Sequence, residues 1–465
     1  MPTLADIILT EREDLVRRAL NQRPPINIID EYGFTPLIEA AIADHAGIAH
    51  LLLSAGAEVD LKDMTGSTAL HWAAENNNLA LAKELLERGA DPNAYNLSGQ
   101  PLGVLPFLRG QREMRRLLES HGANVGFIKD YVNTKQLGHM FELVGFGSIL
   151  SPKGELVEVS FEGFMPEVTI AMIAESLGQF QNHFAARVVR RYAGIAAVIT
   201  EVLHRAARLI RFQQYRVDVK KHQQEIFPLI QEDPLLIPVS FEGHAITFIR
   251  HGDFLAKCDR REDSRLFDSI IFYRIGRLDR MNNDFVQQMI YKKQSDVSVN
   301  ELLPSWLELS IVGHLHIPAQ ITGNCSWANV EGSIPALFYL LKENPEKPGP
   351  DGKLSQKQAM EYFNQWRKWN CERALLFCLR RFLEEKGLGV RATIAETLAA
   401  VLFQACNKGT AIENERAERI ITALSESPFH EILRNYVKVW AYEDTGPEGR
   451  HFLRMLEKYG YHMER

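Results

Sequence analysis

The amino-acid sequence predicts a multidomain protein in which an all-α solenoid is followed by an α+β domain with extra helices. Three observations support this fold class. Self-similarity with a period of 33 residues fills the N-terminal part, alternating β-branched segments lie between residues 235 and 275, and helical patterns return towards the C-terminus. A chain of 465 residues is also longer than a single hydrophobic core usually supports.

The repeat begins with a glycine turn that precedes a helical pair. Its copies are "DEYGFTPLIEAA" (30–41), "DMTGSTALHWAA" (63–74) and, more weakly, "NLSGQPLGVL" (96–105). Gly33, Gly66 and Gly99 permit the turn, and a second glycine in each copy ends the second helix. This pattern resembles the ankyrin repeat, with residues 3–29 as a degenerate N-terminal cap.

The ankyrin resemblance implies a surface that binds a partner protein. The expected contacts are the hairpin tips and the face of the inner helix: Glu31, Tyr32, Met64, Thr65, Leu97, Ser98, Glu75 and Asn76. The alternative is that so short an array only packs on the next domain. His71, inside the motif, is expected to be structural.

We expect the cap and three ankyrin units to occupy residues 1–130. The α+β domain would cover 131–345, with a helical insertion at 166–230, and a helical region over 346–465 would pack on it. A Pro-Lys-Gly turn within residues 141–164 predicts a hairpin at the start of the second domain.

Composition and charge exclude several classes of protein. The net charge of −6 does not favour phosphate backbones, and five cysteines without a CxxC pair indicate a reducing compartment without disulfides. The N-terminus lacks the basic region of a Sec signal, and no apolar run appears long enough to cross a membrane. Residues 187–221 carry nine Lys or Arg against two acids, but their continuous apolar stripe favours a core helix over nucleic-acid or acidic-lipid binding. We expect a monomer without membrane, nucleic-acid, metal or other cofactor partners.

A candidate nucleophile lies in "ITGNCSWANVEGSIPALFYLL" (321–341). Cys325 follows a Gly-Asn turn and precedes a helix-compatible run, a position that lowers the pKa of a thiol. Gln320 lies five residues upstream, and Pro335 is expected to break or kink the helix. Asn324 is either an oxyanion donor or a turn residue. The alternative for Cys325 is a buried structural thiol.

A candidate base and its orienting carboxylate lie in "EGHAITFIRHGDFLAKCDR" (242–260). A turn at His251-Gly252 would place His244 opposite Asp259, with Cβ atoms about 5 Å apart. The alternatives are a strand histidine and a turn carboxylate without a catalytic role. His314 and His316 form a second possible base or a metal pair, although no third ligand is near them in the sequence.

The Asn-Cys-Ser-Trp string and the Gly-His-Ala strand together resemble papain-like cysteine proteases. The resemblance implies that Cys325 attacks, His244 is the base, Asp259 orients it, and Gln320 with backbone N–H groups stabilises the oxyanion. The order His, Asp, Gln, Cys departs from papain itself and is similar to that of the adenovirus-protease and deSUMOylase relatives.

Ankyrin repeats joined to such a domain resemble the ankyrin-repeat effectors of intracellular bacteria such as Legionella. This resemblance implies type IV secretion into the host cytoplasm or nucleus, binding of a host protein, and hydrolysis of a peptide, isopeptide or acyl bond. The rival hypothesis is a non-catalytic adaptor with a protease-like docking domain.

Overall fold

The computed structural model describes residues 4–461 except 31–32, 164, 214–218, 242, 262–268, 321–322, 344, 346–351 and 443–446. The contacts divide the chain into two compact units. The first unit contains Met1–Gln136, Phe146–Ser160 and Cys378–Arg465, and the second contains Leu137–Gly145 and Phe161–Phe377. These limits do not coincide with the predicted boundaries at 130 and 345, because a hairpin and the last helices group with the repeats.

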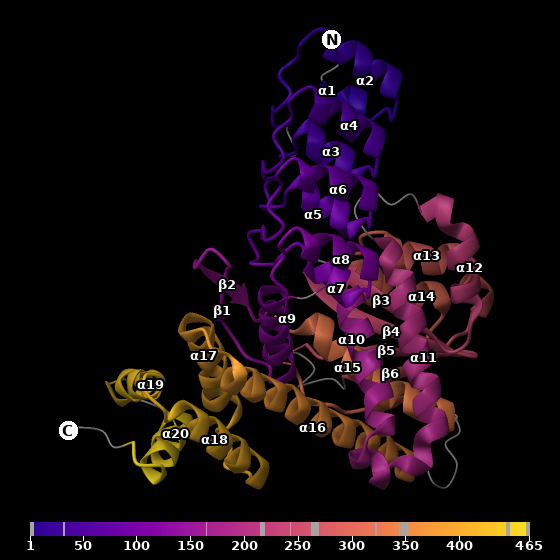
Figure 1. Ribbon diagram of the computed structural model, residues 1–465. Helices are drawn as coiled ribbons and strands as arrows, with labels where there is room; N and C mark the ends of the chain where they lie inside the picture. Colours follow the sequence, from indigo (N-terminus) through magenta and orange to yellow (C-terminus); the bar gives the residue numbers. More distant parts are fainter. Residues whose placement is uncertain are drawn as a thin grey trace. The chain divides into compact units, whose positions relative to one another are not determined.

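Stacked pairs of short helices begin the first unit (Figure 1). They are α1 (Leu4–Ile8) with α2 (Glu13–Leu20), α3 (Pro36–Ile42) with α4 (Ala46–Ser54), α5 (Ala69–Glu75) with α6 (Leu79–Glu87), and α7 (Val104–Leu108) with α8 (Arg112–Ser120). The Thr35 hydroxyl caps α3 by accepting the Ile38 N–H at 3.2 Å. Small and branched apolar side chains form one core from Leu4 to Leu118. This is the paired-helix solenoid that the 33-residue period predicts.

The first unit also contains a β-hairpin beside the repeats. α9 (Val125–Met140) precedes β1 (Phe146–Leu150), which pairs antiparallel with β2 (Leu156–Ser160). The Tyr95 hydroxyl donates to Glu155 at 3.0 Å, and Lys153 lies 2.8 Å from Asp91. These contacts hold the hairpin against the loop that leads into the third predicted repeat.

The C-terminal helices of the first unit are α17 (Leu388–Ala405), α18 (Ala411–Leu424), α19 (His430–Tyr442) and α20 (Pro447–Lys458). In the described chain, α17 is the helix whose length and composition would allow it to cross a membrane, although the sequence suggested no such run. Half of α17 is buried within the protein, and many core helices have the same length and composition.

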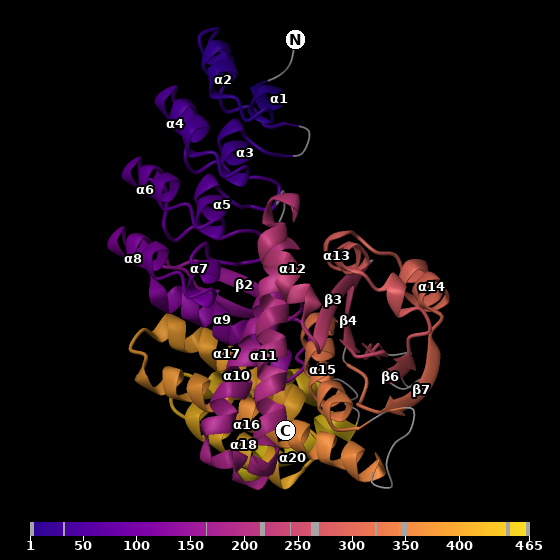
Figure 2. The same cartoon turned by 90° about the vertical axis from the view of Figure 1, so that its right-hand side faces the viewer.

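A five-stranded antiparallel sheet forms the centre of the second unit (Figure 2). Its strands follow chain order: β3 (Leu235–Phe241), β4 (His244–His251), β5 (Phe254–Cys258), β6 (Ile270–Arg274) and β7 (Ser310–Leu315). Side chains alternate between the two faces. Ile246, Phe248 and Leu255 enter an apolar core with Val286 and Met289 on one face.

Helices surround this sheet. They are α10 (Pro166–Asn182), α11 (Ala193–Ile210), α12 (Gln223–Gln231), α13 (Asn283–Tyr291), α14 (Leu303–Leu307), α15 (Cys325–Lys342) and most of α16 (Gly352–Glu384). Short turns are η1 (Phe184–Val188), η2 (Arg190–Tyr192), η3 (Arg211–Gln213), η4 (Val219–His222), η6 (Leu278–Arg280) and the π-helical η7 (Ser298–Leu302). The multidomain fold class, with ankyrin repeats and a separate antiparallel sheet among helices, is thus confirmed.

The basic stretch at 187–221 includes α11, whose apolar stripe is buried. Ile199, Leu203 and Ala206 are at most 1% exposed. On the outer face, Arg208 lies 3.9 Å from Glu201, and Arg191 lies 3.0 Å from Glu361. The contacts are those of a core helix with a charged outer face.

Candidate active site

Cys325 is the first residue of α15, and every residue from Ser326 to Leu340 is buried. Gly323 precedes it with a φ of +84°, a conformation that favours glycine. The Asn324 side-chain amide donates to the His139 carbonyl at 3.0 Å, and its oxygen accepts from Nδ1 of His139 at 2.6 Å. Of the two roles left open for Asn324, these contacts favour the turn residue.

Pro335 was expected to break or kink α15, and it does not break it, because the helix continues through Pro335 to Lys342. Proline removes one backbone hydrogen bond from a helix. Its neighbours Ile334 and Ala336 are fully buried, and this packing stabilises the helix despite the missing bond.

The side chains of His244 and Asp259 meet at the end of the sheet. The distance from Nε2 of His244 to Oδ1 of Asp259 is 2.9 Å, and the side chains are 15% and 11% exposed. The predicted register was wrong by two residues, because β4 and β5 pair His251 with Phe254 around a turn one residue later than expected. A shift of two keeps both side chains on the same face, and diagonal neighbours remain within reach of each other.

The thiol of Cys325 is partly buried and lies beside His244, which lowers the pKa of the thiol. Because Asp259 binds Nε2, Nδ1 is the ring nitrogen left to face the sulfur. Burial raises the pKa of the Cys325 thiol, but the bonds from His244 and from the backbone N–H groups of Ala245 and Ser326 together lower it below 9.0. Such a site favours the thiolate.

Charges around His244 stabilise its protonated form. Burial alone would lower the pKa of His244, but the hydrogen bonds with Asp259 and Cys325 raise it to about 9. Asp259 is also buried, yet His244 and Lys257 hold the pKa of its carboxyl well below 3.8. The carboxylate is therefore ionised beside a charged imidazolium.

Two further cations and their partners fix Asp259. Lys257 Nζ lies 3.3 Å and Arg261 Nε 3.1 Å from Oδ2 of Asp259. Arg261 also lies 3.2 Å from Asp296, and Lys257 donates to Asn300 at 2.5 Å. The segment that carries Asp296 and Asn300 thus supports the carboxylate from outside.

Gln320 lies beside the residue that follows Asp259. Its backbone N–H donates to the Arg260 carbonyl at 2.9 Å. The residue is 9% exposed, and Oε1 is buried without a hydrogen-bond partner among the described residues. The side-chain carbonyl therefore has an unused acceptor in a buried position.

Sequence reasoning missed Asn329, one helical turn after Cys325. Its side chain donates to the Ala245 carbonyl at 2.6 Å and accepts the Arg260 N–H at 2.8 Å. Ala245 follows His244 and Arg260 follows Asp259, so one amide holds the backbone beside both residues against α15. The signal in the sequence is an amide four residues after the cysteine, in a helix whose buried residues are mostly apolar.

A network of four charges lies beside this arrangement, with Arg260 and Glu331 buried and Glu142 and Arg367 partly exposed. Arg367 binds Glu142 at 2.8 Å and Glu331 at 3.3 Å, while Arg260 lies 3.4 Å and 3.8 Å from the same two carboxylates. Arg260 also donates to the Pro318 carbonyl at 2.9 Å. Two charges of each sign balance one another and tie α15 and α16 to the loop that leads to Gln320.

The other candidate groups are exposed histidines and buried cysteines. His314 and His316 are exposed, on β7 and just after it, and the contacts of the Cys325 thiol involve His244 instead. Among the described residues, no group of three His, Cys, Asp or Glu side chains is placed to hold a metal ion. The remaining cysteines are buried: Cys258, Cys371, Cys378 and Cys406.

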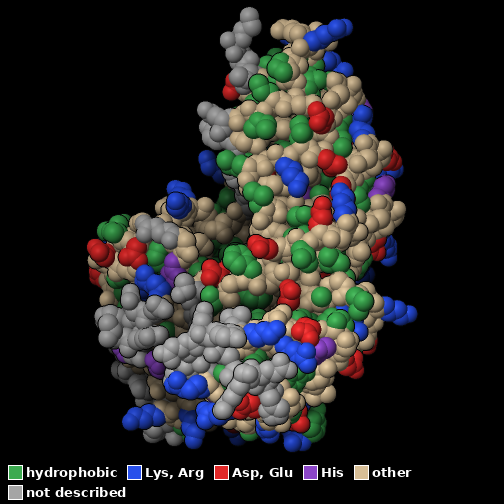
Figure 3. Space-filling model, turned by 90° about the vertical axis from the view of Figure 1, so that its left-hand side faces the viewer, with side chains coloured by type: hydrophobic (Ala, Val, Ile, Leu, Met, Phe, Trp, Pro, Cys, Tyr) green, Lys and Arg blue, Asp and Glu red, His purple; other side chains and the backbone are tan. Residues whose placement is uncertain are grey.

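The predicted partner-binding residues of the repeats divide into two groups. Met64 and Leu97 are 67% and 80% exposed, and Thr65 and Ser98 beside them are also exposed. Hydrophobic side chains dot the upper part of the face in Figure 3, where the repeats lie. Asn76 instead donates to the Ala41 carbonyl at 3.0 Å between repeats, and Glu75 beside it is half-buried. Glu31 and Tyr32 lie outside the described residues.

Comparisons with known proteins agree on the repeats and extend to the whole chain. A family model described as ankyrin repeats, in three copies, matches residues 7–96. Inversin of Danio rerio is 44% identical over 62 residues, which is 13% of this chain and 6% of inversin. A putative ankyrin repeat-containing protein of Treponema pallidum is 36% identical over 107 residues, 23% of this chain and 36% of that protein. The chain thus spans about a third or less of these two relatives.

One solved structure resembles the chain along its full length. It is the structure of the Legionella effector AnkH, with 34% sequence identity and a TM-score of 0.87. The likeness covers 100% of this chain and 98% of that one, so it includes the sheet and α15 as well as the repeats.

Proposed function

Since the chain belongs to the family of the Legionella effector AnkH, we propose that it is a bacterial effector that binds a host protein through its repeats and cleaves an acyl bond with Cys325. The second unit would then be a papain-like thiol hydrolase. The observation that carries this proposal is the contact of one thiol, one imidazole and one ionised carboxylate at the start of a buried helix.

The first half of the reaction forms a thioester. The Cys325 thiolate, paired with the protonated His244, attacks the carbonyl carbon of a peptide or isopeptide bond, forming a C–S bond while the π electrons move to oxygen. The side-chain amide of Gln320 and backbone N–H groups at the start of α15 would stabilise this oxyanion. When the C–N bond breaks, His244 gives its proton to the leaving amine, and the acyl group remains on sulfur.

The second half releases the acid. His244 takes a proton from water, the oxygen attacks the thioester, and the C–S bond breaks to regenerate the thiolate beside the imidazolium. An amine in place of water would give acyl transfer by the same steps. Asp259 keeps Nε2 of the imidazole occupied, so that Nδ1 faces the sulfur in both halves.

Iodoacetamide labelling of the full-length protein at pH 7, with mass spectrometry of each cysteine, tests this proposal. We expect Cys325 to react fast and the four buried cysteines slowly, which makes them internal controls. Cys325→Ala should remove the fast phase without changing thermal stability. The hydrolase is wrong if Cys325 reacts no faster than an ordinary exposed thiol.

A non-catalytic adaptor is the second candidate, favoured by the exposed apolar tips Met64 and Leu97. In that case Cys325→Ala would leave every cellular effect intact, whereas Met64→Asp with Leu97→Asp would abolish it. A hydrolase that recruits its substrate through the repeats would instead lose its cellular effect in either set of variants.

The family also supports delivery into a host cell, and we propose a type IV secretion system and action in the host cytoplasm or nucleus. A reporter enzyme fused to the chain should appear in host cells only when the bacterium has an intact secretion system. Delivery without that system would contradict type IV secretion but would not affect the proposed reaction at Cys325.

A further inference from the structure

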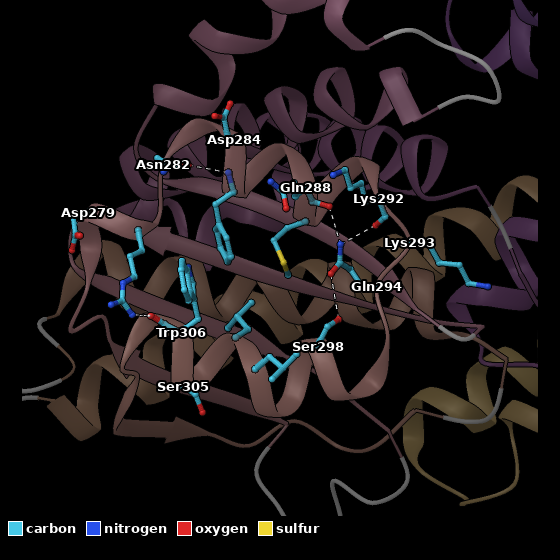
Figure 4. Close-up of a pocket in the computed structure, with 15 residues that line it drawn as sticks. Asp279, Asn282, Asp284, Gln288, Lys292, Lys293, Gln294, Ser298, Ser305 and Trp306 are labelled. Atoms are coloured by element: carbon cyan, nitrogen blue, oxygen red, sulfur yellow. Dashed lines mark hydrogen bonds between the residues drawn. The ribbon is translucent and has the colours of Figure 1, made fainter.

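A cavity of about 910 Å³ in the second unit has no part in the steps above (Figure 4). It lies among η6, α13, η7 and α14, and we call it the α13–α14 pocket. Its apolar lining is Phe285, Met289, Leu302, Leu303 and Trp306. Trp306 is 52% and Leu302 60% exposed, so large apolar side chains face an open space. Such lining is typical of a binding site.

Hydrogen bonds hold the walls of the pocket in place without a ligand. Arg280 donates to the Trp306 carbonyl at 2.7 Å, and its guanidinium lies 4.6 Å from the centre of the indole ring. At the other end, the Gln294 amide donates to the carbonyls of Gln288 and Lys292 at 2.8 and 2.9 Å. A preformed wall of this kind loses little entropy when a ligand binds.

One end of the pocket, at Gln294, lies close to the strand end that carries His244. Gln294 forms a parallel bridge with Phe241, and Phe241 is the strand partner of His244. Two strand spacings of about 4.8 Å place the Gln294 backbone about 10 Å from that of His244. An extended peptide advances about 3.3 Å per residue, so three residues cover this distance.

Charges at the pocket ends differ. Lys292 and Lys293 are exposed at the end away from Asp279 (Figure 4). Asp279 is already bound by Arg277, with N–O distances of 3.0 Å. Asp284 adds an exposed carboxylate to the lining away from the lysines. The lysine end is therefore the positive end, where an acidic side chain would fit.

From these contacts we propose that the α13–α14 pocket selects the substrate. It receives a large apolar side chain of an extended polypeptide, about three residues from the bond that Cys325 attacks, with an acidic neighbour at Lys292 and Lys293. This inference rests on the proposed hydrolase and adds its substrate class.

Peptidyl chloromethyl ketones with an otherwise all-alanine sequence test the pocket. Leucine or glycine is placed two, three or four residues from the ketone, and the rate of Cys325 alkylation is compared with that of iodoacetamide. We expect leucine to be at least 10-fold faster than glycine at one of these positions. Aspartate beside that leucine should add a preference that Lys292→Glu with Lys293→Glu reverses.

Two variants separate pocket from nucleophile. Leu302→Asp, at an exposed position that tolerates charge, and Trp306→Ala should each reduce the leucine preference below 2-fold while the iodoacetamide rate stays unchanged. Ile311→Asp is the matched control, because Ile311 is 58% exposed on β7 outside the pocket. Two results would overturn the inference, provided that Cys325 still reacts fast with iodoacetamide. One is a leucine preference that remains in both pocket variants, and the other is the absence of a leucine preference at every position tested. Slow iodoacetamide labelling of Cys325 would instead contradict the proposed hydrolase, and the inference about its substrate would fail with it.

Discussion

His71 in the first unit and His244 in the second are both largely buried imidazoles with a residue of their own chain as hydrogen-bond partner. Nδ1 of His71 accepts the Thr68 N–H at 3.1 Å and lies 3.0 Å from its hydroxyl. Burial dominates there and lowers the pKa of His71 to about 4. At His244 the partner is a carboxylate, and the pKa rises to about 9.

The difference teaches that burial alone does not set the chemistry of a histidine. A neutral partner leaves the desolvation cost in control, so His71 stays uncharged and caps a helix. An ionised partner that is itself held by Lys257 and Arg261 overcomes the same cost, so His244 holds a proton at neutral pH. Only the second arrangement suits proton transfer.

The largest expected effect comes from removing one imidazole and keeping the other. His244→Ala should slow iodoacetamide labelling of Cys325 at pH 7 by about 100-fold or more, since the thiolate loses its counter-ion and base. His71→Ala is the matched control and should leave labelling unchanged while lowering stability. If Cys325 is labelled at the same rate in His244→Ala as in His71→Ala, His244 does not activate the thiol.

The next prediction changes the partner instead of the imidazole. Asp259→Ala should lower the pKa of His244 from about 9 towards its ordinary value, because the carboxylate no longer opposes burial and Cys325 alone remains to raise the pKa. We expect Cys325 labelling at pH 7 to fall by about 10- to 100-fold. Side-chain NMR titration of His244 measures the pKa directly, and a value that stays near 9 would assign the shift to another group.

The repeats and the site differ in how far the sequence predicts them. The 33-residue period is local, so the helix pairs and their turn glycines follow from residues that are neighbours in the chain. The hairpin that carries His244 was predicted with the wrong register, because alternation fixes the face of a strand but does not fix the residue at which the chain turns. A two-residue error kept the face and hence the contact with Asp259.

The residues that hold the site in place could not be predicted from local sequence patterns. Asn329 bonds to residues 84 and 69 positions away, and Arg367 reaches Glu142 across 225 positions. No pattern in one sequence pairs them. The unbroken helix at Pro335 likewise depends on packing by distant segments and overrides a local preference.

Asn329 gives a smaller and more specific effect. Asn329→Ala should slow Cys325 labelling by about 10-fold, since the backbones beside His244 and Asp259 lose their shared clamp, and should cost about 1–3 kcal/mol of stability. Ser333→Ala, four residues further along the same helix and equally buried, is the control. A loss of stability in both variants without a change in labelling would make Asn329 merely structural.

The smallest predicted effect concerns the pH dependence of stability, which has opposite signs at His71 and at His244. His71 has a folded-state pKa below the unfolded 6.5, so its stabilisation is present above pH 6.5 and is lost as pH falls towards 4. His244 has a folded-state pKa above 6.5, so its stabilisation is full below pH 6.5 and is lost as pH rises through 9. Lowering the pH from 7.5 to 5.5 should weaken α5 by about 1.4 kcal/mol and strengthen β4.

Hydrogen exchange of peptides from α5 and β4 at the two pH values, corrected for intrinsic exchange, measures this difference. His71→Gln should abolish the pH dependence in α5 alone, because glutamine caps without titrating, and Asp259→Asn should reduce it in β4 alone. If both elements instead respond in the same direction and neither variant changes the response, the two histidines are not what separates the units. Asp259 would then have no measurable effect on stability, and the thiolate of Cys325 would be the group that keeps His244 protonated at neutral pH.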